Sequence, residues 1–340
     1  MTIINIPIEP LKDRYSIDWQ KWFDTAFKKY KIPFINVFGE KLRTENEIID
    51  GSFLDVLETN YYKSTQLQEL IRLIYSKEIT EDSILFFHDL WNPSLASLAY
   101  IRDGMGIPFK IMGCLHAGTY DEHDFLAQKG MEKWACYLET SWFGHIVDKI
   151  FVATEFHKNL LTYHRMVDKD KIKVTGFPIY PRKSWEDIQK INKKNIVVFP
   201  HRLDPEKNPD NFKKLEATIT TFYNSCDWQF IRTKDVCKNK EEYYDLLEQA
   251  KIAVSFSDQE TWGIAMEEAV FAGCVPFVPN GLSYPELYNK NFIYDSWIKL
   301  VQQIQNDPKD FYCSLQSQYD DFEYKGKEAI PNIIKELLSP

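Results

Sequence analysis

The sequence predicts an α/β protein with two domains, each built on a parallel β-sheet. Short apolar runs alternate with helical segments along most of the 340 residues, which is the pattern of parallel sheets. The chain is long enough for two domains with separate cores. Residues 184–194 are charged and lack a strong apolar period, so we expect the linker there. The predicted domains are residues 1–190 and 191–320, followed by a C-terminal helix at 321–340.

The first half of the chain predicts one parallel sheet, because each apolar run is separated from the next by a helical segment. The expected strands are residues 3–8, 34–38, 84–87, 109–115, 149–154 and 172–174. The expected helices are residues 19–30, 54–61, 65–76, 94–105, 134–147 and 155–163. Residues 119–130 are polar and are expected to form a loop.

The second half repeats this alternation. The expected strands are residues 196–199, 228–231, 252–256 and 274–278. The expected helices are residues 210–225, 241–250 and 264–272. Two further segments, residues 290–294 and 297–304, precede a terminal helical tail. In that terminal segment Ala329, Ile333, Ile334, Leu337 and Leu338 form an apolar stripe with near-helical spacing, and Pro331 lies at its start.

Residues 252–278 read as strand, polar loop, helix and strand, and this unit carries the best candidate site. Its loop and helix N-terminus fall at the carboxyl end of the sheet, where open α/β folds bind ligands. The helix N-terminus suits phosphate, and Gly263 has no Cβ to obstruct a diphosphate. Glu260 before the helix and Glu268 within it offer carboxylates to hydroxyl groups. The alternative is that Glu260, Glu267 and Glu268 are solvated charges.

The motif Glu260-x7-Glu268-Ala269 contains Gly263-Ile264 and precedes Ala272-Gly273-Cys274-Val275-Pro276. It resembles the signature of glycosyltransferase family 4. The resemblance implies the GT-B fold, with two Rossmann-like domains facing a central cleft and a C-terminal helix that crosses back to the first domain. It also implies a nucleotide-sugar donor, with a UDP-sugar expected. Thr261 and Trp262 depart mildly from the small residue and the Phe usual in this family.

The same resemblance assigns donor-binding roles to five positions of the motif. Glu260 is expected on the donor sugar and Glu268 on the ribose. The backbone around Trp262, Gly263 and Ile264 is expected at the diphosphate.

The segment His201-Arg-Leu-Asp-Pro-Glu-Lys-Asn208 follows the first strand of the second domain. It resembles the family loop that places an Arg and a Lys, here Arg202 and Lys207, on the donor phosphates. Fixed cations at that place stabilise the charge that develops on a departing nucleoside diphosphate. The alternative is a solvated turn in which Asp204 and Glu206 neutralise both cations.

His116 ends a strand of the first domain and resembles the family His beside the donor sugar, although a lone His after a strand is more often structural. The cluster Asp121, Glu122, His123 and Asp124 offers metal ligands or an acceptor base, but a solvated loop is the favoured interpretation. We expect no metal requirement, since GT-B enzymes generally hold the diphosphate with cations and helix ends.

Two departures from the family leave recognition of the nucleotide base open. The family's Gly-rich turn after the first strand is replaced by residues 7–14, which contain no Gly. The Gly-rich turn expected after strand 228–231 is replaced by Arg232-Thr-Lys234.

Composition limits the function classes. A net charge of −9 argues against binding nucleic acid over a large surface, although a local basic groove stays possible. The six cysteines form no C-x-x-C pair and several lie in apolar runs, which favours free thiols in a reducing compartment, the cytoplasm. We expect neither a signal peptide nor a membrane span.

The function predicted from the sequence is a retaining glycosyltransferase, with His116, Arg202, Lys207 and Glu260 as catalytic residues. Residues 6–19 and 114–121 look similar to glycosyltransferases of tailed bacteriophages. The first acceptor hypothesis is therefore a hydroxymethylated base in phage DNA, modified in the host cytoplasm. Trp91, Tyr120, Trp134 and Trp142 are candidates for stacking on a base or sugar, or else core residues.

Other functions stay open at this point. The acceptor alternatives are a polysaccharide, a lipid-linked glycan or a small molecule. The functional alternatives are a nucleotide-sugar epimerase and a non-catalytic nucleotide-sugar binding module. The sequence leaves the oligomeric state open.

Overall fold

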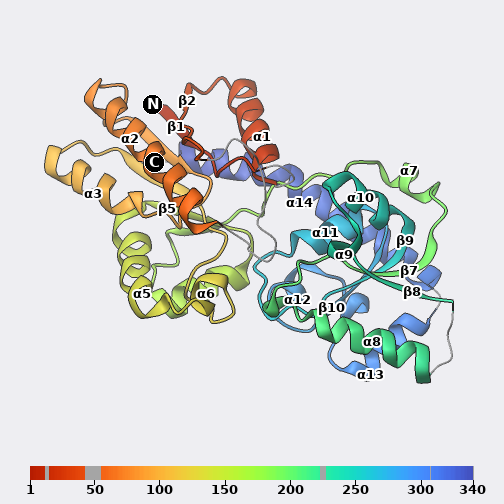
Figure 1. The fold of residues 1–340 in the computed structure, drawn as a ribbon. Coiled ribbons are helices and arrows are strands. Elements are labelled where there is room, and N and C mark those ends of the chain that lie inside the picture. The colour runs from red at the N-terminus through yellow and green to blue at the C-terminus, as the bar shows by residue number, and fades with distance from the viewer. Residues whose placement is uncertain (12–14, 43–54, 223–226, 307, 340) are drawn as a thin grey trace. The chain divides into compact units, whose positions relative to one another are not determined.

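The computed structural model describes residues 1–11, 15–42, 55–222, 227–306 and 308–339. These residues form two compact units (Figure 1). Unit 1 comprises residues 1–176 and 329–340, and unit 2 comprises residues 177–328.

Unit 1 contains a six-stranded sheet whose described strand pairs are all parallel. Its strands are β1 (Thr2–Ile6), β2 (Phe34–Asn36), β3 (Ser83–Phe87), β4 (Lys110–Cys114), β5 (Lys149–Val152) and β6 (Ile172–Val174), in the order β2-β1-β3-β4-β5-β6. After β1 the chain adds β2 on one side of β1, and it then adds β3 on the other side. The strand order therefore reverses between β1 and β3, and such a switch point opens a crevice at the carboxyl ends of the strands.

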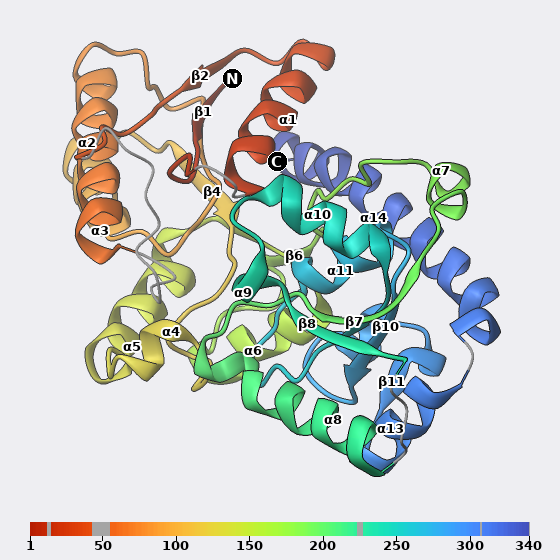
Figure 2. The ribbon, with the colours of Figure 1, turned by 45° about the vertical axis from the view of Figure 1, so that its right-hand side comes forward.

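Both faces of this sheet are covered. Leu85 and Phe87 of β3 belong to an apolar core shared with α2 and α3, which lie side by side in both views (Figures 1 and 2). Phe86, between them, points to the opposite face, where its ring centroid lies 5.0 Å from that of Phe23 in α1. Every residue of β3 is therefore buried, as expected for a central parallel strand. The helices of unit 1 are α1 (Tyr15–Lys29), α2 (Val56–Tyr75), α3 (Ser94–Met105), α4 (Phe125–Gln128), α5 (Glu132–Ser141), the π-helix η1 (Trp142–Ile146) and α6 (Glu155–Arg165).

Unit 2 contains a five-stranded sheet whose described pairs are also parallel. Its strands are β7 (Lys194–Phe199), β8 (Gln229–Arg232), β9 (Ala250–Val254), β10 (Val275–Pro279) and β11 (Ile293–Tyr294), in the order β11-β10-β9-β7-β8. The strand order reverses between β7 and β9, so the crevice of this sheet opens at the carboxyl ends of those two strands.

The helices of unit 2 follow the expected alternation. They are α7 (Trp185–Gln189), η2 (Pro205–Lys207), α8 (Pro209–Phe222), α9 (Thr233–Val236), α10 (Lys240–Gln249), α11 (Ile264–Phe271), α12 (Tyr284–Leu287), η3 (Lys290–Phe292), α13 (Trp297–Gln305) and η4 (Pro308–Phe311).

Helix α14 (Tyr312–Leu338) begins in unit 2 and ends in unit 1. Its last part buries Ala329, Ile333 and Leu337, and Lys149 Nζ of β5 donates to the carbonyl of Glu336 at 2.9 Å. The predicted return of the C-terminal helix to the first domain is therefore confirmed. Pro331 lies inside the helix and does not end it, because the apolar residues on either side of it are buried.

Several local expectations were wrong. Residues 54–61 and 65–76 were expected to form two helices, but a single helix, α2, runs from Val56 to Tyr75. Leu54 lies outside the described residues. Ser64, between the two expected helices, is accommodated in α2 because its Oγ donates to the carbonyl of Asn60 at 2.7 Å. The expected loop at 119–130 contains the short helix α4, and the charged segment 184–194 contains α7, with Trp185 and Ile188 buried.

Two further findings concern the composition-based expectations. No helix in the described ranges is both long and apolar enough to cross a lipid bilayer. The five described cysteines, at positions 114, 136, 237, 274 and 313, are free thiols, and Cys114 and Cys274 are buried. Cys226 lies outside the described residues, as do residues 12–14 of the turn that lacks Gly and residues 223–225 of the helix expected at 210–225.

Candidate active site

Two loops meet at the switch point of the unit 2 sheet, one following β7 and one following β9. The Nδ2 of Asn208, in the first loop, donates to the carbonyl of Phe256 at 3.0 Å. The backbone N–H of Asp258, in the second loop, donates to the carbonyl of Glu206 at 2.8 Å. The loops are thus fixed to each other by backbone and side-chain hydrogen bonds, and the residues they carry keep a defined geometry.

The Lys207–Glu260 ion pair bridges the two loops. Lys207 Nζ lies 2.8 Å from Glu260 Oε1 and also donates to the carbonyl of Gln259. The two side chains expose only 6% and 15% of their surface, so the pair is only weakly screened by water. The structure therefore brings together two residues that the sequence predicted as a phosphate ligand and a sugar ligand.

His201 lies against this pair but does not form a salt bridge with it. Its Nδ1 is 3.8 Å from Glu260 Oε1. Burial, and then the charges of Lys207 and Arg202, hold the pKa of His201 well below its ordinary value. The imidazole is therefore neutral, and its contact with Glu260 is polar rather than ionic. Sequence reasoning quoted His201 only as part of the loop motif.

Arg202 has a different environment from Lys207. Its guanidinium contacts Asp204 Oδ2 at 3.1 Å and Glu206 Oε1 at 3.2 Å. The neutralised turn considered as the alternative is thus the arrangement found for Arg202, whereas Lys207 is directed to Glu260. Contact between Arg202 and a phosphate stays a prediction.

Gly263 begins α11 in a backbone conformation that favours glycine. Its φ is +94°, and a Cβ at this position would lie 3.2 Å from the ring of Tyr284. The N–H groups of Ile264 and Ala265 at the start of α11 have no acceptor within the helix. Those of Met266 and Glu267 already donate to the carbonyl of Gly263. Together with the helix dipole, the first two N–H groups form an anion-binding end beside Glu260.

Glu268 is held by two tyrosines of α10, which lies beside α11 (Figure 2). The hydroxyls of Tyr243 and Tyr244 donate to its two carboxylate oxygens at 3.0 and 2.6 Å. Lys240 Nζ is 3.6 Å from the same group. Sequence reasoning missed both tyrosines; the available signal was an adjacent Tyr pair on the helix that precedes the strand–loop–helix unit.

Glu267 and Trp262 form a buried pair. The hypothesis that Glu267 is a solvated charge was wrong, because its exposed fraction is 0%, and that of Trp262 is 3%. The indole N–H of Trp262 donates to Glu267 Oε2. Burial raises the pKa of Glu267 well above its ordinary value, more than this hydrogen bond lowers it. Trp262 introduces a buried donor here, and Glu267 provides its acceptor.

We predict that the stability of Glu267→Gln, relative to the wild-type protein, increases as pH rises. The raised pKa means that the folded state binds the Glu267 proton more tightly than the unfolded state. The resulting contribution to the free energy of unfolding is complete below the pKa of Glu267 in the unfolded chain, about 4.3. It is lost as pH rises through the higher pKa that Glu267 has in the folded protein. Gln keeps an acceptor for Trp262 but has no proton to lose. Thermal unfolding between acid and mildly alkaline pH should show the Tm difference, variant minus wild type, increasing with pH.

The matched control for this measurement is Glu241→Gln, which removes an exposed carboxylate from α10. Its Tm difference should stay nearly flat over the same range. A flat Tm difference for Glu267→Gln as well would contradict the assignment of a buried, protonated carboxyl.

His116 of unit 1 follows β4 and has both ring nitrogens engaged. Nε2 lies 2.8 Å from the carbonyl of His88, and Nδ1 lies 3.3 Å from the hydroxyl of Tyr15. Because the carbonyl only accepts, the neutral ring carries its proton on Nε2. Burial lowers the pKa of His116, and the nearby Asp89 opposes that shift. The role of His116 beside the donor sugar stays a prediction.

The acidic cluster of unit 1 makes local turns and caps. Asp121 Oδ1 accepts from the backbone N–H of His123 at 3.0 Å, and Asp124 Oδ1 caps α4 by accepting from Leu126 at 2.9 Å. Within the part of the chain that the structure describes, three or more His, Cys, Asp or Glu residues nowhere gather in a way that holds a metal ion.

The four aromatic candidates divide between core and surface. Tyr120 and Trp142 are buried in the core of unit 1, and Trp91 donates its indole N–H to the buried carboxylate of Glu139 at 2.8 Å. Trp134 is 43% exposed. Trp134 is therefore the only one of the four that is available for stacking without rearrangement of the core.

Solved structures with the same architecture match nearly the whole chain. Sucrose-phosphate synthase from Thermosynechococcus elongatus matches with a TM-score of 0.72 at 12% identity, covering 99% of this chain and 98% of that one. Anabaena Alr3699/HepE in complex with UDP and glucose matches with a TM-score of 0.59 at 12% identity, covering 99% of both chains. An α,α-trehalose-phosphate synthase (UDP-forming) from Burkholderia vietnamiensis matches with a TM-score of 0.60 at 10% identity, covering 99% of this chain and 98% of that one.

The chain has the GT-B fold. At these identities the likeness establishes the fold alone, and it confirms two parallel-sheet domains of the predicted kind. No protein-family model matches the sequence. Among curated proteins, the tRNA-queuosine alpha-mannosyltransferase of Drosophila melanogaster is 28% identical over 165 residues, which cover 41% of this chain and 44% of the relative. The match thus spans less than half of either protein. None of these comparisons supports a phage origin or a DNA acceptor.

Proposed function

We propose that this GT-B protein is a retaining glycosyltransferase that moves a sugar from a nucleotide-sugar donor, a UDP-sugar, to an acceptor hydroxyl. The observation that carries the proposal is the Lys207–Glu260 pair beside the N-terminus of α11, at the switch point of the unit 2 sheet. Support comes from a curated mannosyltransferase relative and from a fold shared with a protein solved with UDP and glucose.

Each residue of the site has one part in this reaction. The first N–H groups of α11 bind the donor diphosphate, and Lys207 stabilises the negative charge that grows as the diphosphate departs. Glu260 accepts hydrogen bonds from hydroxyls of the donor sugar, and Glu268, oriented by its two tyrosines, accepts from the ribose. Arg202 adds a second cation, whose charge is partly balanced by Asp204 and Glu206.

The bond changes balance without a protein nucleophile. The bond between the anomeric carbon and the diphosphate oxygen breaks, and its electron pair leaves with the nucleoside diphosphate. The acceptor oxygen attacks the same face of the sugar, so the anomeric configuration is retained. The acceptor proton passes to the departing phosphate oxygen. Positioning and charge stabilisation therefore account for the protein's contribution.

Acceptors other than phage DNA are favoured. The acceptor candidates are a polysaccharide, a lipid-linked glycan and a small molecule. The Drosophila relative suggests a further candidate, a modified nucleoside of tRNA. The test is mass spectrometry of the products after UDP-sugars are offered with glycans, small polyols and tRNA. A new glycosylated product supports the proposal, and its absence in the Glu260→Gln variant ties it to this site. Conversion of the UDP-sugar alone into its epimer would favour an epimerase, and binding without turnover would favour a binding module.

We predict that transfer persists in excess EDTA, at a rate within about twofold of the untreated enzyme. The physical reason is that Lys207 and the helix end already provide positive charge for the diphosphate. The measurement compares initial rates before and after chelation, with added Mg²⁺ or Mn²⁺ as a separate arm. Complete loss of transfer that either cation restores would contradict this prediction and direct attention to Asp121, His123 and Asp124.

A further inference from the structure

Two adjacent tyrosines of α10 determine where the carboxylate of Glu268 lies. Tyr244 Oη donates to Oε1 at 2.6 Å, and Tyr243 Oη donates to Oε2 at 3.0 Å. Neighbouring residues of a helix point about 100° apart, so the two phenols reach Glu268 from different directions. Their ring centroids are 5.3 Å apart and their ring planes are inclined by 64°. The carboxylate is therefore fixed both in its position and in the orientation of its plane.

The tyrosine pair is itself held by its surroundings. Just before the pair, α10 begins with a side-chain cap, in which Asn239 Oδ1 accepts from the backbone N–H of Glu242 at 2.9 Å. Two cations lie over the ring of Tyr244. The guanidinium of Arg182 is 4.4 Å from the ring centroid, and Lys240 Nζ is 5.4 Å from it. These contacts restrict the ring, so its hydroxyl is directed at Glu268 before any ligand arrives.

The tyrosines leave part of the carboxylate for a ligand. Both phenols act as donors, because a carboxylate only accepts. Burial, and then the charge of Glu268, raise the pKa of Tyr243 well above its ordinary value, so this phenol keeps its proton. A carboxylate has about four acceptor sites, and each tyrosine uses one site on one oxygen. One further hydrogen bond can thus be accepted on each oxygen of Glu268, whose side chain is 14% exposed.

The place of Glu268 on α11 suits the ribose of a nucleotide whose phosphates lie at the helix end. Glu268 follows Ile264 by one helical turn, which is about 6 Å along the axis. In a nucleoside diphosphate the ribose hydroxyls are separated from the first phosphate by the sugar ring, a distance of the same order. Ribose carries two neighbouring hydroxyls, and 2′-deoxyribose carries only one of them. Two accepting oxygens side by side therefore match ribose and do not match 2′-deoxyribose.

We propose that Tyr243 and Tyr244 are positioning residues that make the donor site selective for ribonucleotides over 2′-deoxyribonucleotides. They hold Glu268 in place in advance, so binding of the two hydroxyls does not have to immobilise a flexible side chain. A 2′-deoxyribose leaves one oxygen of the carboxylate without the donor that it is placed to meet. The inference rests on the proposed function, because it concerns the nucleotide of the same donor.

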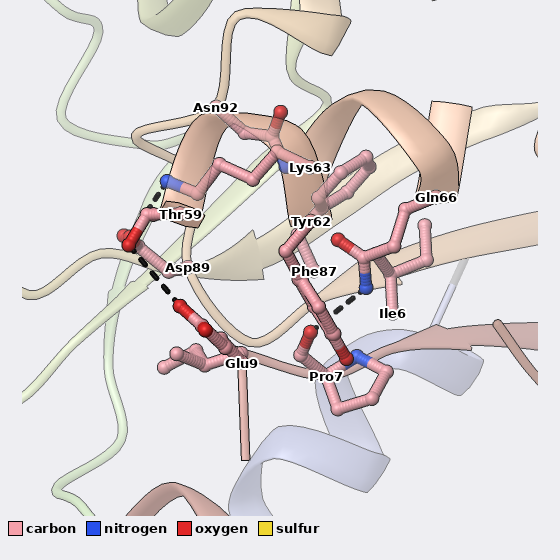
Figure 3. A pocket seen from close by; sticks show the side chains of 11 residues that line it. Ile6, Pro7, Glu9, Thr59, Tyr62, Lys63, Gln66, Phe87, Asp89 and Asn92 are labelled. Carbon is pink, nitrogen blue, oxygen red and sulfur yellow. Dashed lines mark hydrogen bonds and ion pairs between the residues drawn. The ribbon is translucent and has the colours of Figure 1, made fainter. Parts of the chain in front are cut away.

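The experiment is calorimetric titration of the full chain with UDP and, separately, with 2′-deoxy-UDP. The quantity measured is the ratio of the two dissociation constants. The test variant combines Tyr243→Phe with Tyr244→Phe, which deletes only the two hydroxyls, and the same pair is also introduced into Glu268→Gln. The matched control is Thr59→Val, which deletes a hydroxyl that donates to the buried carboxylate of Glu9 at 3.1 Å in unit 1 (Figure 3).

The wild-type protein is expected to bind UDP about tenfold or more tightly than 2′-deoxy-UDP. The double Phe variant should reduce this preference to about twofold, because Glu268 then has to be ordered by the ligand. Thr59→Val should keep the full preference. In the Glu268→Gln background the tyrosine substitutions should change the ratio no further, because they act through Glu268.

Three results would overturn the inference while UDP binding, and with it the proposed function, stands. These are an unchanged preference in the double Phe variant, an equal weakening of both nucleotides, and equal binding of both nucleotides by the wild-type protein. A further fall of the ratio in the Glu268→Gln background would contradict the positioning role, since the tyrosines would then contact the ribose themselves. Failure of the wild-type protein to bind UDP contradicts the proposed function, and this inference with it.

Discussion

Glu260→Gln is expected to lower kcat/KM for sugar transfer by about 10- to 100-fold, since each charge-assisted hydrogen bond to a sugar hydroxyl contributes about 1.5–3 kcal/mol. Gln keeps the size of the side chain and one accepting oxygen, but it loses the charge that pairs with Lys207 at 2.8 Å. The loss should appear mainly in kcat if the contact strengthens as the sugar becomes positively charged. Steady-state kinetics with varied UDP-sugar measures both parameters.

The control for this variant lies in the same loop. Asp258→Asn removes an exposed negative charge two residues before Glu260 but keeps an oxygen to accept from Asn208 Nδ2, which donates to Asp258 Oδ2 at 2.7 Å. It should therefore change kcat/KM little. Equal kcat and KM in Glu260→Gln and the wild-type protein would remove Glu260 from the reaction. A similar loss in Asp258→Asn would point to a general effect of loop charge.

Lys207→Met is expected to have the larger effect, about 100-fold or more on kcat/KM, together with weaker UDP binding. Met keeps the apolar length of the side chain but removes the cation that faces the departing diphosphate. It also leaves the mostly shielded carboxylate of Glu260 without its ionic partner, which costs about 3–5 kcal/mol where burial is complete and less here. Transfer kinetics, UDP titration and thermal unfolding separate the catalytic effect from the structural one.

A double variant tests whether these two residues act as one unit. Adding Glu260→Gln to Lys207→Met should restore part of the lost stability, because the unpaired charge is removed. The control is Lys213→Met, an exposed lysine of α8 that pairs with Asp210 at 3.1 Å. Strictly additive stability losses, or a loss of UDP binding in Lys213→Met equal to that in Lys207→Met, would contradict a specific Lys207–Glu260 pair.

The order of strands and helices was predictable from local patterns. The central parallel strands are buried on both faces, so β3, β7 and β10 appear in the sequence as short apolar runs bounded by polar turns. Glycine marked the start of α11, because its φ of +94° disfavours other residues. Spacing alone therefore placed Glu260 before the helix and Glu268 within it.

The details of the candidate site depend on contacts between distant parts of the chain and were not predictable from local patterns. Glu267 looked like its neighbour Glu268 in the sequence, yet one is fully buried against Trp262 and the other faces α10. Helical rotation separates adjacent residues by about 100°, and only the packing partners decide which direction is the core. The partners of Arg202 were correctly identified in the alternative hypothesis, because Asp204 and Glu206 lie in the same turn.

The most direct test of the account is hydrogen exchange of the wild-type protein with and without saturating UDP. The central claim is that a nucleoside diphosphate binds at the N-terminus of α11, between the loops that carry Lys207 and Glu260. UDP should then slow amide exchange most strongly in residues 260–268, and also in residues 201–208. Unchanged exchange in residues 260–268 at saturating UDP, or protection confined to unit 1, would contradict the claim.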